Sequence, residues 1–118
     1  MPRNDYIDCM SMDTSLSALS AHASVHQVAA NNIANVNTDG FQASRANLES
    51  GPGDQGVRVA SLTRDTSAGS VFEGRETSNV DLGNEMVSLM TSENAYGANA
   101  AVVRANDEMT GYLLNMMV

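Results

Sequence analysis

Residues 30–41 read Ala-Asn-Asn-Ile-Ala-Asn-Val-Asn-Thr-Asp-Gly-Phe, and this stretch decides how the rest of the chain is interpreted. Its four asparagines fall within seven positions, at the end of a segment whose small and apolar residues recur at helical spacing. Asparagine is unfavourable inside a helix because its side chain competes for backbone hydrogen bonds. Gly40 adopts a positive φ without steric cost, so it predicts a turn that ends the helix. We therefore expect the asparagine side chains to shape the exit from this helix.

The segment before this motif repeats small or apolar residues in alternating steps of three and four. This spacing predicts a helix over about residues 9–36 that packs along its length against another helix. Charged residues are absent from positions 14–38, which predicts that neighbours bury the helix on more than one side. The predicted seam comprises Cys9, Met12, Leu16, Leu19, Ala23, His26, Ala30 and Ile33.

A second helix is predicted over about residues 80–117, with Asp81 as a favourable cap for its positive N-terminal end. A similar alternation of three and four runs along it, interrupted by Glu93 and Asp107. Its predicted seam comprises Leu82, Met86, Leu89, Tyr96, Ala100, Val103, Leu114 and Met117.

The segment between the helices, about residues 42–77, is rich in helix breakers and polar residues. We expect a polar linker over residues 42–56, because Gly51, Pro52 and Gly53 cluster there. Residues 56–62 alternate valines with polar or small residues and predict a short strand. Residues 63–77 are expected to be irregular, with a second short strand or disorder as alternatives. The predicted fold is therefore mainly α: residues 1–118 form one domain in which two long helices pack as a coiled-coil-like hairpin.

Composition excludes several classes of function. The net charge is −8, and all six basic residues are arginines scattered along the chain, so neither nucleic acid nor an anionic membrane surface is an expected partner. The chain contains no apolar run of the length that spans a bilayer, so membrane insertion is not expected. It begins without a recognisable signal peptide, and its single cysteine rules out a disulfide within the chain.

The C-terminal part carries a second group of short motifs. These are Ser78-Asn79-Val80-Asp81, Glu85-Met86, Ala95-Tyr96-Gly97-Ala98-Asn99, Asp107-Glu108-Met109 and Leu113-Leu114. Together with residues 30–41, they resemble the terminal segments of the bacterial flagellar rod and hook axial proteins. The two resemblances lie at opposite ends of the chain and in the family's order. The short segment 42–77 leaves too little chain for the outer β domain of the larger members, so the resemblance is closest to the small proximal-rod type.

The resemblance implies a structural subunit of the basal-body rod that assembles through its terminal helices. It implies other rod subunits, further copies of the chain and the flagellar export apparatus as partners. It also implies export from the cytoplasm to the periplasm-spanning rod without a cleaved signal peptide. Two helices make a small core, so their wide apolar stripes predict homo-oligomers in isolation. The chain departs from the family pattern at Glu93-Asn94, Gly97 and Thr110. The residues expected to serve assembly are Asn31, Asn32, Ile33, Asn35, Asn37, Thr38, Gly40, Phe41, Asn79, Asp81, Glu85, Met86, Tyr96, Asn99, Asp107 and Met109.

Other functions find less support in the sequence. His22 and His26 have a spacing that can hold a metal on one helix face, but no further ligand lies near them on the helix. We therefore expect a packed or half-exposed His26 on the seam and no metal. No nucleophile elbow and no phosphate-binding glycine loop is present, so neither catalysis nor a cofactor is expected. The alternative to a rod subunit is a small soluble helical homo-oligomeric adaptor or regulator that descends from the same family.

Overall fold

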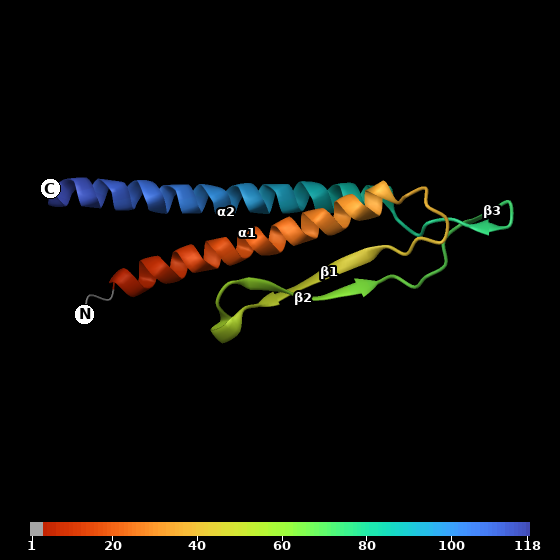
Figure 1. Cartoon of the computed structure of the whole chain (residues 1–118), viewed down its shortest axis with the longest axis horizontal. Helices are drawn as coiled ribbons and strands as arrows, with labels where there is room; N and C mark the ends of the chain where they lie inside the picture. The colour runs from red at the N-terminus through yellow and green to blue at the C-terminus, as the bar shows by residue number, and fades with distance from the viewer. Residues whose placement is uncertain (1–3) are drawn as a thin grey trace.

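The computed structural model describes the backbone of residues 4–118 and the side chains of residues 12–118. Two long helices, α1 (Asn4–Ala34) and α2 (Leu82–Met117), lie side by side and run in opposite directions (Figure 1). Between them the chain forms β1 (Ser44–Ser50), a short 3-10 helix (Pro52–Asp54), β2 (Val57–Arg64), β3 (Val71–Phe72) and β4 (Arg75–Glu76). The predicted mainly helical fold, with a small β region between two long helices, is confirmed.

The helix boundaries differ from the prediction by a few residues. α1 begins at Asn4, before the predicted start near residue 9, and it ends at Ala34 rather than near residue 36. α2 begins at Leu82, directly behind its N-cap Asp81.

The prediction of a polar linker over residues 42–56 is wrong for residues 44–50, which form β1. β1 pairs antiparallel with β2, from Ser44 opposite Arg64 to Ser50 opposite Val57. Because β1 has little intrinsic strand propensity, this pairing and its contact with α1 create the strand. The strand predicted over residues 56–62 is confirmed as β2. β3 and β4 pair with each other rather than with β2.

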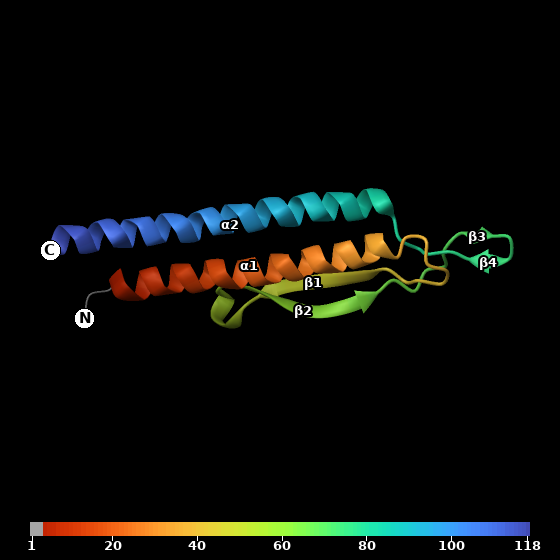
Figure 2. The same ribbon diagram turned by 45° about the horizontal axis from the view of Figure 1, so that its top comes forward.

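The molecule has three layers, with α1 in the middle. Figure 2 shows α2 on one side of α1 and the β1–β2 hairpin on the other. The β3–β4 hairpin projects beyond the ends of both helices, at the opposite end of the molecule from the two termini (Figures 1 and 2). The long axis therefore has a tip formed by β3–β4 and an opposite end formed by the termini.

Within the described residues, the buried apolar core consists of small side chains, those of Ala18, Ala21 and Ala29. The chain is elongated, with extents of 73 × 26 × 14 Å and a radius of gyration of 19.7 Å. A compact chain of this length has a radius of gyration of about 13.5 Å. The accessible surface is 8564 Å², whereas a compact monomer of the same mass exposes about 6,200 Å². The fold therefore leaves an unusually large surface outside its own core.

Candidate assembly surfaces

The first candidate feature is the clamp between Asn32 and the start of β1. Asn32 is fully buried, and its Nδ2 donates to the carbonyl oxygen of Ser44 at 2.7 Å. The backbone N–H of Ser44 donates in return to Oδ1 of Asn32 at 3.0 Å. The side-chain amide thus pairs with the backbone of Ser44 much as a neighbouring strand would. This two-point contact holds β1 against α1.

The second feature is the exit of α1, which is closed by side-chain hydrogen bonds. Nδ2 of Asn35 donates to the carbonyl oxygen of Asn31 at 2.9 Å, and the hydroxyl of Thr38 donates to Oδ1 of Asn35 at 3.1 Å. Gly40 follows with a φ of +69°, the left-handed conformation that favours glycine. Its N–H donates to the carbonyl oxygen of Glu76 at 2.9 Å. The exit of α1 is therefore tied to the end of β4.

Asn79, from the C-terminal motif, forms a second clamp on the same short segment. Its Oδ1 accepts the N–H of Ala43 at 2.7 Å, directly before the residue held by Asn32. Its Nδ2 donates to the carbonyl oxygens of Asp65 at 2.8 Å and Ser67 at 2.9 Å. Asparagines from the two ends of the sequence therefore hold neighbouring residues at the start of β1.

The remaining motif residues of α2 are placed along its length. Asp81 caps the helix by accepting the N–H groups of Gly83 at 3.0 Å and Asn84 at 3.4 Å. The amide of Asn99 turns back to the carbonyl oxygen of Ala95 at 2.8 Å. Of the other predicted motif residues, the exposed ones are Asn37 and, on α2, Met86, Tyr96, Asp107 and Met109. The half-buried ones are Ile33, Phe41 and Glu85.

The far end of the β1–β2 hairpin is held to α1 by a close backbone approach. The N–H of Val57 donates to Oγ of Ser17 at 3.3 Å. Gly56 has a φ of +73°, and a Cβ there would lie 2.5 Å from Oγ of Ser17. A side chain at position 56 would therefore push the hairpin away from α1.

Within the chain, the packed face of α1 is displaced by one position from the predicted seam. The buried residues Ser15, Ala18, Ala29 and Asn32 each directly precede a predicted seam residue. Of the predicted set, Leu16, Ala23, His26 and Ala30 are exposed, and Leu19, Ile33 and Met12 are half-buried. The three layers approach one another most closely at the small buried side chains, and the larger Leu19, Ile33 and Met12 are covered only in part. The side chain of Cys9 lies outside the described residues.

α2 shows the same division. Its buried residue is Ser92, and half-buried Ser88, Ala95 and Asn99 lie on the same face. From the predicted seam, Leu82, Met86, Tyr96, Leu114 and Met117 are exposed, whereas Leu89, Ala100 and Val103 are half-buried. α2 therefore contacts α1 mainly through small or polar residues, and most of its large apolar residues stay exposed.

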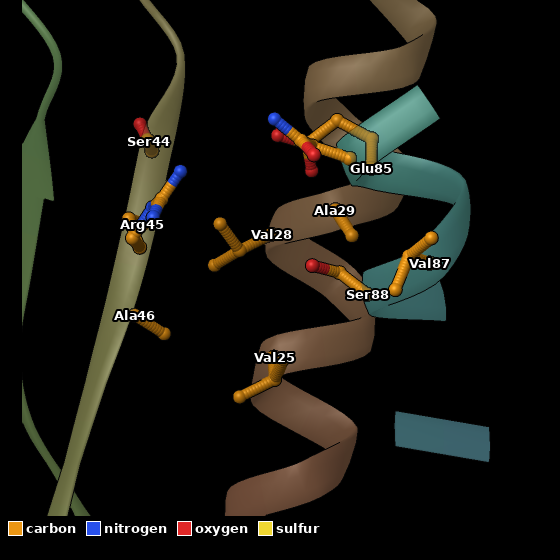
Figure 3. A pocket seen from close by; sticks show the side chains of 10 residues that line it. Val25, Val28, Ala29, Ser44, Arg45, Ala46, Glu85, Val87 and Ser88 are labelled. Atoms are coloured by element: carbon orange, nitrogen blue, oxygen red, sulfur yellow. The ribbon is translucent and has the colours of Figure 1, made fainter. Parts of the chain in front are cut away.

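Two grooves flank the helix pair. The first, of about 430 Å³, lies between β1 and α2 over Val25, Val28 and Ala29 of α1 (Figure 3). Its walls carry opposite charges, Arg45 on β1 and Glu85 on α2.

The second groove, of about 330 Å³, lies between α1 and α2 and is lined by His22, Ala23, His26, Gln27, Ser92, Glu93 and Tyr96. Ala23 is nine residues from Asn32, which is two and a half helical turns, so it lies on the opposite side of α1 from β1. This groove therefore opens away from the β1–β2 hairpin.

His26 contacts α2: its Nδ1 lies 3.3 Å from Oγ of Ser92. Over the part of the chain that the structure describes, no three His, Cys, Asp or Glu residues are grouped closely enough to hold a metal ion. None of the described helices is long and apolar enough to cross a membrane.

One carboxyl group has a shifted pKa. The hydroxyl of Ser67 donates to Oδ1 of Asp65 at 2.6 Å and the N–H of Ser67 does so at 2.9 Å. These hydrogen bonds stabilise the carboxylate and lower the pKa of Asp65 below its ordinary value, with a smaller contribution from the charge of Arg45. The ionised Asp65 thereby orders the turn whose carbonyl groups Asn79 binds.

Comparison with known proteins agrees with the position of these features. Residues 12–42 match the family described as "Flagella basal body rod protein", and residues 75–116 match "Flagellar basal body rod FlgEFG protein C-terminal". No curated protein gives a significant match. The first match contains Asn32 and the exit of α1, and the second contains Asn79 and nearly all of α2. The chain belongs to the flagellar basal-body rod protein family.

Proposed function

We propose that the chain is a structural subunit of the bacterial flagellar basal-body rod that assembles through the exposed faces of α1 and α2. Its partners in this role are other rod subunits and further copies of the chain, and it reaches the rod through the flagellar export apparatus. Family membership supports the structural role. The observation that carries the assembly mode is the surface that the folded chain leaves uncovered.

That surface has the character of an interface. The chain exposes about 2,400 Å² more than a compact monomer of its mass, an excess in the range that permanent protein complexes bury. The exposed side of α1 between positions 14 and 34 carries no charged residue. A helix face that stays in water normally carries charges, so this face is suited to contact another subunit.

The size of the β region supports the small proximal-rod type. The segment between α1 and α2 forms two hairpins, of which β1–β2 packs against α1 and β3–β4 forms the tip. The Asn32 and Asn79 clamps then serve to fix the hairpins relative to the helices, so that each subunit presents one rigid shape to its neighbours.

The test of the proposed function is quantitative mass spectrometry of basal bodies purified from the native bacterium. Stoichiometric peptides from the chain support a rod subunit. Their absence, together with an abundant closed oligomer outside the basal body, would contradict it and favour the adaptor.

The assembly mode is tested with Leu16→Ser, a change at a side chain that is 50% exposed on α1. Because this side chain packs little within the chain, the variant should keep its helix content and melting temperature but enter basal bodies poorly. Leu62→Ser, at an exposed position on β2, is the matched control and should enter normally. Equal incorporation of both variants would contradict assembly through this face of α1.

A further inference from the structure

The tip of the molecule displays apolar side chains that the chain itself does not cover. Val71 and Phe72 on β3 are 71% and 70% exposed. They are presented by a two-residue turn in which Glu73 has a φ of +51° and Gly74 a φ of +79°. Such a turn matches the twist of paired strands, but a glutamate in this conformation costs free energy. A strained turn that exposes one of the few aromatic residues of the chain indicates a contact surface.

The groove between α1 and α2 has a matching character. It is lined mainly by apolar surface, with Ala23 and Tyr96 among its lining residues. Its volume of about 330 Å³ is at the lower end of the range for ligand pockets, so it suits a single large side chain.

The charges around the tip and the groove are complementary. Phe72 is flanked by Glu73 and by Arg75, whose guanidinium lies 3.8 Å from the exposed carboxylate of Asp39. An exposed pair at this distance contributes little, so Arg75 remains available to a partner. Glu93 of α2, at the groove, is suited to pair with Arg75 of the tip. The imidazole groups of His22 and His26, also at the groove, are suited to contact Glu73.

The tip cannot reach the groove of its own chain. Ser92, at the groove, lies about 15 Å along α2 from the beginning of that helix. The β3–β4 tip projects beyond this beginning, in the opposite direction (Figures 1 and 2). The occupant of the groove therefore has to come from another molecule.

We propose that Phe72 of one copy inserts into the groove formed by His22, Ala23, His26 and Tyr96 of a second copy, with Arg75 facing Glu93. The contact joins two different surfaces, so in a pair one copy keeps a free groove and the other a free tip, and the same contact can repeat with further copies. The second copy is displaced along the long axis, because the tip lies at one end and the groove partway along the helices. This inference rests on the proposed rod function and assigns it a specific subunit contact.

Sedimentation equilibrium of the purified full chain tests the anchor. Phe72→Ser should weaken self-association by more than about tenfold, as expected when a large apolar side chain no longer becomes buried. Leu62→Ser, an exposed apolar position on β2, should leave association unchanged. Unchanged association of Phe72→Ser, or a wild-type chain that stays monomeric at millimolar concentration, overturns the proposal.

Charge exchange tests the orientation. Arg75→Glu and Glu93→Arg should each weaken association by roughly three- to tenfold, and the two changes combined in one chain should restore it. A combined variant that associates no better than the single variants overturns the Arg75–Glu93 pairing.

Crosslinking tests proximity directly. In a Cys9→Ser background, a chain with Val71→Cys, which keeps Phe72 beside it, mixed with a chain with Ala23→Cys should give a disulfide-linked heterodimer. Ala98→Cys, at an exposed position of α2 outside the groove, should not replace Ala23→Cys. Equal crosslinking to both positions overturns the contact.

Failure of this contact is distinguishable from failure of the rod function. If Phe72→Ser enters basal bodies and associates like the wild type, the contact is overturned and the rod function stands. If the wild-type chain is absent from basal bodies, the rod function is overturned whatever the result of crosslinking.

Discussion

Replacement of Asn32 by alanine should release the β1–β2 hairpin from α1. The side chain is 0% exposed and makes two hydrogen bonds to the backbone of Ser44, at 2.7 and 3.0 Å. Each such bond contributes about 0.5–1.5 kcal/mol net, and a buried backbone group left without a partner costs about 1–3 kcal/mol. We therefore expect the docked hairpin to lose about 2–4 kcal/mol, depending on how far water reaches Ser44 after the change.

Hydrogen exchange of backbone amides, followed by NMR, measures this loss. The informative amide is that of Val57, which donates to Oγ of Ser17 at the other end of the hairpin. Because Asn32 does not contact Val57, faster exchange there reports undocking of the whole hairpin rather than loss of one bond. An undocking of about 2–4 kcal/mol corresponds to an exchange rate that is about 30- to 1,000-fold higher.

The control is Asn94→Ala, which removes an exposed asparagine from α2. It should leave the exchange of Val57 unchanged. If Asn32→Ala changes the exchange of Val57 by less than about threefold, the clamp does not hold the hairpin and the reasoning fails.

Asn32→Asp adds a pH dependence to the same test. A protonated carboxyl group can still donate to the carbonyl oxygen of Ser44 and accept its N–H, whereas a carboxylate repels that oxygen. Burial also disfavours the carboxylate, so the pKa of the introduced group is raised in the folded state. Docking should therefore be strongest below about pH 4, the ordinary range of an aspartate, and be lost as the pH rises through the raised value. Docking of this variant that does not change with pH would contradict the two-point geometry.

Three further predictions follow from the hairpins and their clamps. In the same exchange assay, Gly56→Ala should destabilise docking of the β1–β2 hairpin more than Gly53→Ala does. Both glycines have a positive φ, but of the two Gly56 alone lies against α1. Equal effects of the two changes would contradict the close approach of Gly56 to α1. Asn79→Ala should cost about 2–4 kcal/mol in urea unfolding, since its three hydrogen bonds join separate segments; a cost near zero would show that the segments hold without it. Ser67→Ala should raise the pKa of Asp65 toward its ordinary value in an NMR titration. The ionised carboxylate stabilises the folded chain, and this stabilisation is lost as the pH falls through the lowered pKa, so in the variant it should be lost at a higher pH. An unchanged titration midpoint would contradict the role of Ser67.

The helices were predictable from the sequence because their periodicity extends over many turns. β2 was predictable for the same kind of reason, since Val57 and Val59 alternate with polar or small residues. β1 was not, because its only apolar residues are Ala46 and Leu48 and it contains Glu49 close to its end. Its strand conformation is imposed by β2 and by the amide of Asn32, and neither contact leaves a local pattern in residues 44–50.

The register of α1 was not predictable from hydrophobicity alone. The pattern selects Leu16 and Ala30, whereas the folded chain buries Ser15 and Ala29 beside them. Alanine and serine add little to a hydrophobic pattern, yet they allow the closest approach between layers. A pattern that ranks positions by hydrophobicity therefore misses the face that the chain packs internally.

In the asparagine motif, too, the sequence does not reveal which contact each residue makes. The sequence indicates that Asn31, Asn32 and Asn35 have a structural task, but their tasks differ. Asn35 closes the helix locally, through Asn31 and Thr38, which are its neighbours in sequence. Asn32 acts on Ser44, and that pairing requires the chain to reverse direction after Gly40.

The clamps of Asn32 and Asn79 also explain why a chain with so small a core can present a defined shape. Ala43 and Ser44 are adjacent, and each is held by an asparagine from a different end of the sequence. The region around α1 and the region before α2 therefore both hold the start of β1. Directional hydrogen bonds fix this junction where few apolar side chains are available to do so. Many large apolar residues of α2, which in a compact monomer would form the core, remain exposed, and under the proposed function they are available to other subunits.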